Sequence, residues 1–212
     1  MKIHNVTQKS EEWLELRKGK ITGSTLKDVL DKKRGKQEWS FNPDKPKTTI
    51  YSLLAHYLAE PDEDGLESNM ERGNRLEREA ILNFANLTGV DYKEVGFITR
   101  DDDERIAISP DGLSEDQTRA PEVKCLSAAN HLEMYKTRDA TAYLLQVVQL
   151  FIAIDSLNLV DLLFYDPRFK NNDIKLFSIQ YTREELSGLI ESVRAAENQV
   201  LEYITQQIKQ LS

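Results

Sequence analysis

Apolar and polar positions recur along the chain with two periods, one typical of helices and one typical of strands. Apolar residues at helical spacing predict helices over residues 10–17, about 22–30, 48–60, 70–88, 127–136 and 140–154, and a final helix that begins at Thr182. Largely apolar runs bounded by turn residues predict strands over 94–100, 105–109, 121–126, 159–165 and 174–181. Ser10 is an expected helix cap, and Gly89 is placed to end the helix before it. This order of elements predicts an α+β fold in which helices flank a central mixed β-sheet.

Further expectations concern the arrangement of these elements. The strands over 94–100, 105–109 and 121–126 are expected to form a meander, and residues 34–47 are expected to be a loop. Glu185 lies three residues after Thr182, which predicts a capping box. No repeat or linker divides the sequence, so we expect one domain over residues 1–212. The final helix has an apolar stripe typical of core packing, with an interface role as the alternative; its members are Leu186, Leu189, Val193, Ala196, Val200, Ile204 and Ile208.

The composition is that of an ordinary globular protein. Of 212 residues, 40% are hydrophobic and 30% are charged. No apolar run reaches the roughly 18 residues of a membrane span, and the first residues lack the apolar core of a signal peptide. The one cysteine, Cys125, cannot form an internal disulfide, and with three scattered histidines it offers neither a zinc site nor a Cys–His nucleophile. We therefore expect a cytoplasmic protein without a membrane partner, in which Cys125 lies in or near the core.

The net charge of −8 hides an uneven distribution. Residues 13–48 carry ten Lys or Arg against five Asp or Glu, a local charge of +5, whereas residues 62–64 and 101–104 are acidic clusters. A solvated surface accounts for most of these side chains. The alternative is a basic region that contacts phosphates beside an acidic metal pocket.

Two acids and one lysine carry the candidate chemistry. Asp111 follows a predicted strand within the sequence Ser-Pro-Asp-Gly-Leu, and Glu122 and Lys124 lie on the next strand. Because side chains alternate along a strand, Glu122 and Lys124 share one face, and a meander brings them towards Asp111. Converging carboxylates bind a hard divalent cation, and a neighbouring lysine positions water or stabilises charge. The set predicts a metal-dependent phosphodiesterase site, although an Asp-Gly turn and a solvated strand face would give the same residues.

A third acid is available on the preceding helix. Glu71, Glu77 and Glu79 are the candidates there. Glu77 is favoured because Gly73, one turn earlier, leaves room for a ligand or another backbone to approach. Helix acids are usually solvated, which is the alternative for all three.

Four segments of the sequence resemble a known family, in the same order and over nearly the whole chain. They are residues 13–24 (WLELRKGKITGS), 73–80 (GNRLEREA), 109–113 with 122–125 (SPDGL and EVKC), and 143–149 with 165–168 (YLLQVVQ and YDPR). The family is that of the phage lambda exonuclease-like viral recombinases, or alkaline exonucleases, within the PD-(D/E)XK nuclease superfamily. The resemblance implies a restriction-endonuclease-like core.

The resemblance also implies roles at the candidate metal site. Asp111, Glu122 and the backbone carbonyl of Val123 would bind Mg²⁺, for which Mn²⁺ would substitute. Glu77 would help to hold a second ion or a water. Lys124 would orient or activate the attacking water, and two ions would stabilise the attacking and leaving oxygens.

Other positions match the family's contacts with DNA. Arg17, Ser24 and Ser109 match a pocket for the 5′-terminal phosphate, which an Arg fork and hydroxyl donors suit chemically. Alternatively, Arg17 is only a surface cation, Ser24 only a helix cap and Ser109 only the end of a strand. Arg34 matches a loop residue that enters the minor groove, and Met70 matches an apolar wedge that splits the terminal base pairs.

One helix departs from the family pattern. The family has Gln-x-Gln after the tyrosine, whereas here Tyr143 is followed by Gln146 and Gln149. Gln146 keeps the family spacing and would lie near the metal site. Gln149 is displaced by one residue, and its role stays open; a polar edge on an apolar helix would explain both.

The implied function is a Mg²⁺-dependent 5′→3′ exonuclease that degrades one strand of double-stranded DNA from 5′-phosphorylated ends. It would leave a 3′ single strand for a single-strand annealing protein, and it would form a homotrimeric ring around DNA in a bacterial or phage-infected cell. Two alternatives remain: a PD-(D/E)XK endonuclease of DNA repair or defence, and a non-catalytic protein that binds DNA ends.

Overall fold

The computed structural model describes residues 1–32, 38–41, 70–126 and 128–211, with side chains of the fourth helix described from residue 76 onwards. Arg34, the predicted helix over 48–60 and most of the predicted loop over 34–47 lie outside these ranges. The elements in chain order are β1 Lys2–His4, α1 Glu11–Arg17, α2 Gly23–Val29, β2 Leu30–Lys32, β3 Trp39–Phe41, α4 Met70–Thr88, β4 Tyr92–Lys93, β5 Phe97–Thr99, β6 Ala107–Ile108, β7 Leu113–Ser114, β8 Arg119–Lys124, α5 Ala128–Thr137, the 3₁₀ turn η1 Thr141–Tyr143, α6 Leu144–Ala153, β9 Leu159–Tyr165, α7 Asn172–Lys175, β10 Leu176–Thr182 and α8 Ser187–Leu211.

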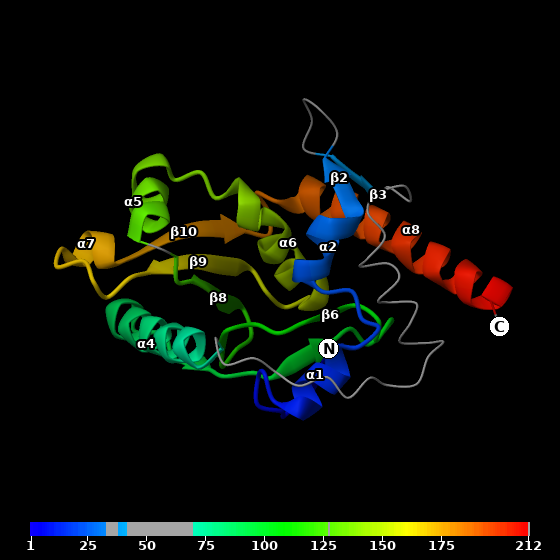
Figure 1. Cartoon of the computed structure of the whole chain (residues 1–212), viewed down its shortest axis with the longest axis horizontal. Helices are drawn as coiled ribbons and strands as arrows, with labels where there is room; N and C mark the ends of the chain where they lie inside the picture. Colours follow the sequence, from blue (N-terminus) through cyan, green and yellow to red (C-terminus); the bar gives the residue numbers. More distant parts are fainter. Residues whose placement is uncertain (33–37, 42–69, 127, 212) are drawn as a thin grey trace.

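A mixed sheet of order β10-β9-β8 lies at the centre of the molecule (Figure 1). β9 pairs antiparallel with β10 and parallel with β8. Parallel neighbours need a crossover connection, and here it contains α5 and α6. The predicted α+β fold with a central mixed sheet is therefore confirmed.

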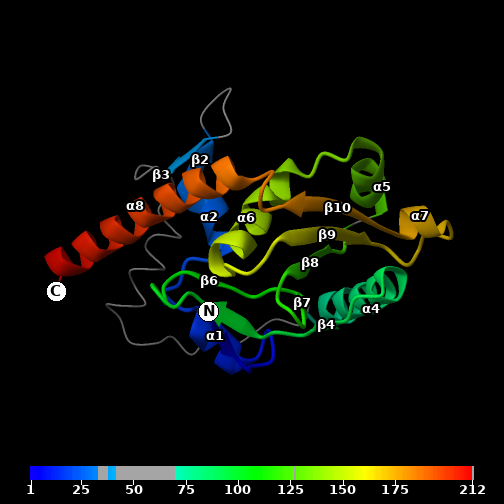
Figure 2. The same cartoon turned by 180° about the vertical axis from the view of Figure 1, so that it is seen from behind.

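Alternation along the strands sends side chains to two apolar layers. Val123 and Leu163, which are register partners, join a small cluster with Ala80 and Phe84 of α4. The neighbouring β9 side chains, such as Leu162, belong to the larger core with α6 and α8. Figure 2 shows α4 along β8 and β9, with α6 across the sheet from it. Helices thus cover both faces, and the face that carries Glu122 and Lys124 is the one towards the larger core.

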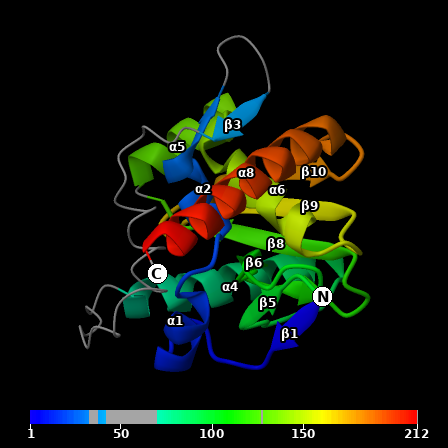
Figure 3. The ribbon, with the colours of Figure 1, turned by 90° about the vertical axis from the view of Figure 1, so that its right-hand side faces the viewer.

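The smaller sheets correct one prediction. β5 and β6 pair with each other and with β1, and β4 pairs with β7. β8, the third strand of the expected meander, pairs with β9 instead of β6. The predicted meander is therefore wrong beyond its first two strands. The backbone of β8 forms its strand hydrogen bonds with β9, which is distant in the sequence. In Figure 3 the strands β1 and β5 lie below β8 and β9, on the side of α1.

Several local predictions are confirmed. The Ser10 hydroxyl caps α1 by accepting from the Trp13 N–H at 3.2 Å, and Gly89 ends α4 with a φ of +69°. The Thr182–Glu185 capping box is formed, although regular helix begins later, at Ser187. The stripe of α8 is buried, with Ile208 partly so, which confirms core packing. Cys125 is partly buried against the small cluster, and burial raises the pKa of its thiol to about 12.

One strand lies where a loop was predicted. Trp39–Phe41 pairs with Leu30–Lys32 as a short hairpin that packs on α8, where the rings of Phe41 and Tyr203 are 5.4 Å apart. Three-residue strands are too short to produce a recognisable alternation, so the pattern missed it. None of the helices in the described ranges combines the length and apolar character needed to cross a bilayer.

Candidate active site

The turn after β6 places Asp111 against the open edge of β8. The backbone N–H of Val123 donates to Asp111 Oδ2 at 2.7 Å. β9 occupies the other edge of β8, so the carboxylate takes the place of a neighbouring strand. The N–H and C=O of one strand residue point to the same edge, and the Val123 carbonyl therefore faces the Asp111 side as well.

Glu122 and Lys124 lie side by side on one face of β8, as the alternation predicted. Lys124 Nζ is 2.7 Å from Glu122 Oε1, and the two side chains are 15% and 8% exposed. The ammonium also lies 5.4 Å from the centre of the Tyr143 ring, at the start of α6. Its hydrogen bond to Glu122 and the nearby ring hold the lysine at the edge where Asp111 sits.

Burial and neighbouring charges shift the pKa values of two groups in the site. Burial and then the Glu122 carboxylate raise the pKa of Asp111 well above its usual range, against the opposing effects of Lys124 and the Val123 N–H. Burial lowers the pKa of Lys124, but Glu122 and Asp111 outweigh it and raise that pKa overall. The lysine is therefore charged at neutral pH.

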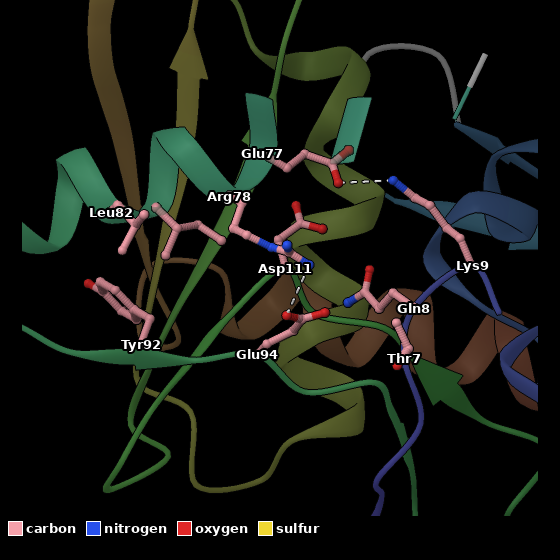
Figure 4. A pocket seen from close by; sticks show the side chains of 10 residues that line it. Thr7, Gln8, Lys9, Glu77, Arg78, Leu82, Tyr92, Glu94 and Asp111 are labelled. Carbon is pink, nitrogen blue, oxygen red and sulfur yellow. Dashed lines mark hydrogen bonds and ion pairs between the residues drawn. The ribbon is translucent and has the colours of Figure 1, made fainter. Parts of the chain in front are cut away.

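Glu77 reaches the same region from α4. It lines a cavity of about 250 Å³ together with Asp111, Arg78, Tyr92 and the segment 7–9 (Figure 4). Glu77 Oε2 is 3.0 Å from Lys9 Nζ. The other helix candidates differ: Glu79 accepts a hydrogen bond from the Tyr165 hydroxyl, and the side chain of Glu71 lies outside the described part. Of the two α4 acids whose side chains the structure describes, Glu77 is thus the one that lines a cavity with Asp111.

The donors at this edge are oxygens. Asp111, Glu122 and the Val123 carbonyl combine two carboxylates with one backbone oxygen, a set that suits Mg²⁺. Within the described ranges, no three His, Cys, Asp or Glu side chains form a group that could hold a metal ion by themselves. The observation that fits a divalent cation is the position of Asp111 at the β8 edge, where its carboxylate contacts the Val123 N–H and its pKa is raised by burial and by Glu122.

A second polar cluster includes Ser109, which is two residues before Asp111. Arg17 donates to the hydroxyls of Ser109 at 3.2 Å, Ser24 at 3.1 Å and Thr22 at 3.2 Å. Burial lowers the pKa of the Arg17 guanidinium, and no carboxylate pairs with it in the described part of the chain. The structure brings Arg17, Ser24 and Ser109 together as the resemblance implied, with Thr22 added.

Trp13 fixes the direction of one hydroxyl in this cluster. Its indole N–H is shared between Ser109 Oγ at 2.8 Å and the Gly96 carbonyl at 3.0 Å, and the Arg17 guanidinium lies 4.4 Å from the centre of its ring. Ser109 Oγ therefore accepts from both Trp13 and Arg17. With both lone pairs used, its own proton is left to donate outwards.

The two glutamines of α6 occupy different environments. Gln146 is half-buried where α6 meets α2, and a Cβ on Gly23 would lie 3.0 Å from its Cα. Gln149 is fully buried and donates to Glu197 of α8 at 2.9 Å. Gln149 is therefore a core residue between two helices. Met70 is the first residue of α4, and its side chain lies outside the described part.

Sequence reasoning assigned no role to Trp13, Thr22, Gln8 or Lys9. Trp13 and Arg17 are four residues apart on a helix, a spacing that places both on one face and was available as a signal. Gln8 contacts residues at least 87 positions away along the chain, and Lys9 contacts Glu77, which is 68 positions away. The sequence carries no local signal for those contacts.

Comparisons with known proteins give a family match and similar folds. The family model that describes the YqaJ-like viral recombinase domain matches residues 12–153 of this chain. The crystal structure of LHK-Exo in complex with dAMP has a TM-score of 0.76 at 26% identity, over 95% of this chain and 96% of that one. A second structure, of the alkaline exonuclease LHK-Exo from Laribacter hongkongensis, gives a TM-score of 0.68 at 26% identity, over 96% and 100% of the two chains.

A phage-related exonuclease from Haemophilus somnus 129PT shares the fold. Its TM-score is 0.60 at 16% identity, over 91% of this chain and 96% of that one. No match was found among curated proteins.

Proposed function

The chain belongs to the family of YqaJ-like viral recombinase domains, and we propose that it is a Mg²⁺-dependent 5′→3′ exonuclease acting on double-stranded DNA with 5′-phosphorylated ends. One observation carries the proposal: Asp111, Glu122 and Lys124 converge at the open edge of β8. Such an enzyme would degrade one strand and leave a 3′ single strand for recombination by annealing. We further propose that residues 1–212 act as one exonuclease domain.

The proposed metal site uses the oxygens at that edge. Asp111, Glu122 and the Val123 carbonyl would hold Mg²⁺, and Glu77 would contribute to a second ion. The ions supply charge stabilisation to the reacting phosphate and make a water more acidic. The raised pKa of Asp111 fits this assignment, because burial and the Glu122 carboxylate disfavour its charged form, which a bound cation would stabilise.

The residues of the chain would act around the phosphate as follows. The Lys124 ammonium, kept charged by Glu122 and Asp111, would donate a hydrogen bond that orients the attacking water and would stabilise charge in the transition state. The Val123 N–H holds the Asp111 carboxylate in one orientation. Gln146 is proposed to line the site from α6.

The requirement for a 5′-phosphate is assigned to Arg17, Ser24 and Ser109. A buried guanidinium without an acidic partner in the described part, beside hydroxyl donors, is suited to a phosphate. Because Ser109 is two residues before Asp111, a terminal phosphate bound there would place the adjoining phosphodiester near the carboxylates. Trp13 would direct the Ser109 hydroxyl towards that phosphate.

The remaining parts of the proposal rest on the family. Arg34 would enter the minor groove and Met70 would separate the terminal base pairs. A homotrimeric ring would keep a protein of net charge −8 on DNA by enclosing it. A single-strand annealing protein would receive the 3′ strand, and the enzyme would work in the cytoplasm of a bacterial or infected cell. LHK-Exo was crystallised with dAMP, a mononucleotide of the kind that such digestion releases.

Digestion of linear duplexes tests the direction and the need for an end. A duplex labelled at its 5′-phosphate should release the label as mononucleotide at once, whereas a 3′ label on the same strand should appear last. Covalently closed circular DNA should stay intact. Cleavage of the closed circle would favour a repair or defence endonuclease. Binding of linear ends without any release of nucleotide would favour a non-catalytic end-binding protein.

A further inference from the structure

Lys9 holds the carboxylate of Glu77 inside the cavity that Asp111 also lines. Lys9 Nζ lies 3.0 Å from Glu77 Oε2, and the side chains are 22% and 30% exposed. Figure 4 shows the lysine reaching across the cavity towards the helix acid from the N-terminal segment. The Lys9 ammonium is thus paired with Glu77, the acid that α4 contributes to the site.

Contacts of the N-terminal segment position the Lys9 side chain. The Gln8 amide donates to the carbonyls of Pro110 at 2.6 Å and Val95 at 3.2 Å, which anchors the segment beside the turn that carries Asp111. Lys9 then adopts a φ of +66°. A residue with a Cβ disfavours this left-handed conformation, so the surroundings must hold it there.

A structural role alone accounts poorly for this arrangement. A partly exposed ion pair stabilises a fold weakly, and here it comes with an unfavourable backbone conformation. The cavity beside the pair, about 250 Å³, has room for a hydrated ion or a phosphate group. The pair therefore lies where a second cation would need the same oxygen.

We propose that Lys9 is a tethered cation that competes with the second divalent ion for Glu77. The inference rests on the proposed function, because it takes Glu77 as a ligand of that ion. The second ion binds by displacing the Lys9 ammonium, so its site fills at a higher ion concentration than the site at Asp111 and Glu122. Lys9 thereby sets the divalent ion concentration at which both sites are occupied.

Mn²⁺ titration of the full chain without DNA tests this, with free Mn²⁺ counted by electron paramagnetic resonance. Wild type should show a tighter and a weaker site. Lys9→Met should tighten the weaker site by up to about fivefold, the factor that corresponds to losing a partly exposed ion pair. Lys9→Arg should resemble wild type because it keeps the charge. Lys93→Met, which removes a lysine from the exposed pair with Glu115, is the matched control and should leave both sites unchanged.

A second variant guards against misfolding. Lys9→Gly removes the ammonium and suits the left-handed backbone, so it should fold at least as well as wild type and should tighten the weaker site equally. A Mn²⁺ titration that is unchanged or weakened in both Lys9→Met and Lys9→Gly would overturn the proposal. So would a Glu77→Gln chain that keeps the weaker site, because Glu77 would then not be its ligand.

These outcomes are separate from those of the proposed exonuclease function. Failure of the Lys9 proposal would leave the digestion of 5′-phosphorylated DNA unaffected. Failure of the exonuclease proposal would appear as absent digestion by wild type, whatever the Mn²⁺ titration shows.

Discussion

Val123 donates its backbone N–H to the Asp111 carboxylate at 2.7 Å, which fixes the turn after β6 against a strand of another sheet. The contact brings Asp111 to the edge of β8, beside the face that presents Glu122 and Lys124. The candidate site therefore depends on how two sheets meet rather than on one continuous strand pairing.

The proposed 5′-phosphate pocket predicts a loss of discrimination between DNA ends. Arg17→Gln removes the guanidinium that contacts Ser109 and Ser24. Because charge-assisted hydrogen bonds to a phosphate are lost, digestion of 5′-phosphorylated DNA should slow roughly tenfold to hundredfold, while the slow digestion of 5′-hydroxyl DNA should change little. The ratio of the two rates is the measurement. Arg194→Gln, which removes a cation from α8, is the control and should keep the wild-type ratio; an unchanged ratio in Arg17→Gln would remove the pocket from the account.

The Glu197 carboxyl predicts a pH dependence of stability. Burial raises its pKa to about 7, and both Glu197 Oε2 and Gln149 Oε1 lack hydrogen-bond partners in the described part. A proton on Glu197 could serve both atoms. The folded pKa lies above the unfolded value of about 4.3, so the folded state binds more protons and stability falls as pH rises from about 4.3 to about 7, by about 3 kcal/mol.

Glu197→Gln should remove that dependence. Its amide can donate to Gln149 and accept from it, as the protonated acid would. Urea unfolding should show similar stability for both chains near pH 4, and a variant more stable by about 3 kcal/mol at pH 8. A wild-type advantage at pH 8 would show that Glu197 is stabilising when charged.

The buried ion pair between Arg119 and Asp161 predicts a large cost when one partner loses its charge. Asp161 is fully buried and also accepts from Gln180 at 2.8 Å. Asp161→Asn leaves the Arg119 charge without its carboxylate, so the free energy of unfolding should fall by about 3 kcal/mol. Glu115→Gln breaks an exposed pair with Lys93 and should leave the urea midpoint unchanged. Equal effects of the two variants would contradict this difference in burial.

Two glycines predict opposite responses to the same methyl group. A Cβ at Gly23 would lie 3.0 Å from Gln146 Cα and 3.2 Å from Gln149 Cβ, whereas a Cβ at Gly188 would meet nothing within 4 Å. Gly23→Ala should push α2 from α6 and destabilise the fold by about 1–3 kcal/mol. Gly188→Ala should be neutral or stabilise it by up to about 1 kcal/mol, through helix propensity. Thermal unfolding of both variants measures the contrast, and a destabilised Gly188→Ala would count against it.

Local periodicity predicted the long elements well. The helix over 70–88 and the strand over 159–165 have the predicted bounds, because each carries an apolar pattern over several residues. The pairing of β8 with β9 was missed, although two helical segments between them are what a parallel crossover needs. Strands of two or three residues, such as β4 and β7, are too short to show a pattern.

In the candidate site, too, the local pattern predicted one contact and missed another. Glu122 and Lys124 are two residues apart on one strand, so alternation alone predicted their common face, which the 2.7 Å contact confirms. The approach of Lys9 to Glu77 depends on a left-handed residue and on a contact across 68 positions. Neither is encoded in a local pattern.

The most direct test of the central claim is the digestion of 5′-phosphorylated linear duplex by wild type and by Lys124→Met, in Mg²⁺ and in EDTA. Wild type should release mononucleotides only with Mg²⁺, and Lys124→Met should be slower by roughly a hundredfold or more, since it loses the group that we propose orients water and stabilises charge. Asp111→Asn, which keeps the side-chain shape, should lose activity similarly, and circular dichroism should show both variants folded. Wild-type rates from folded Lys124→Met and Asp111→Asn would contradict the assignment of this site.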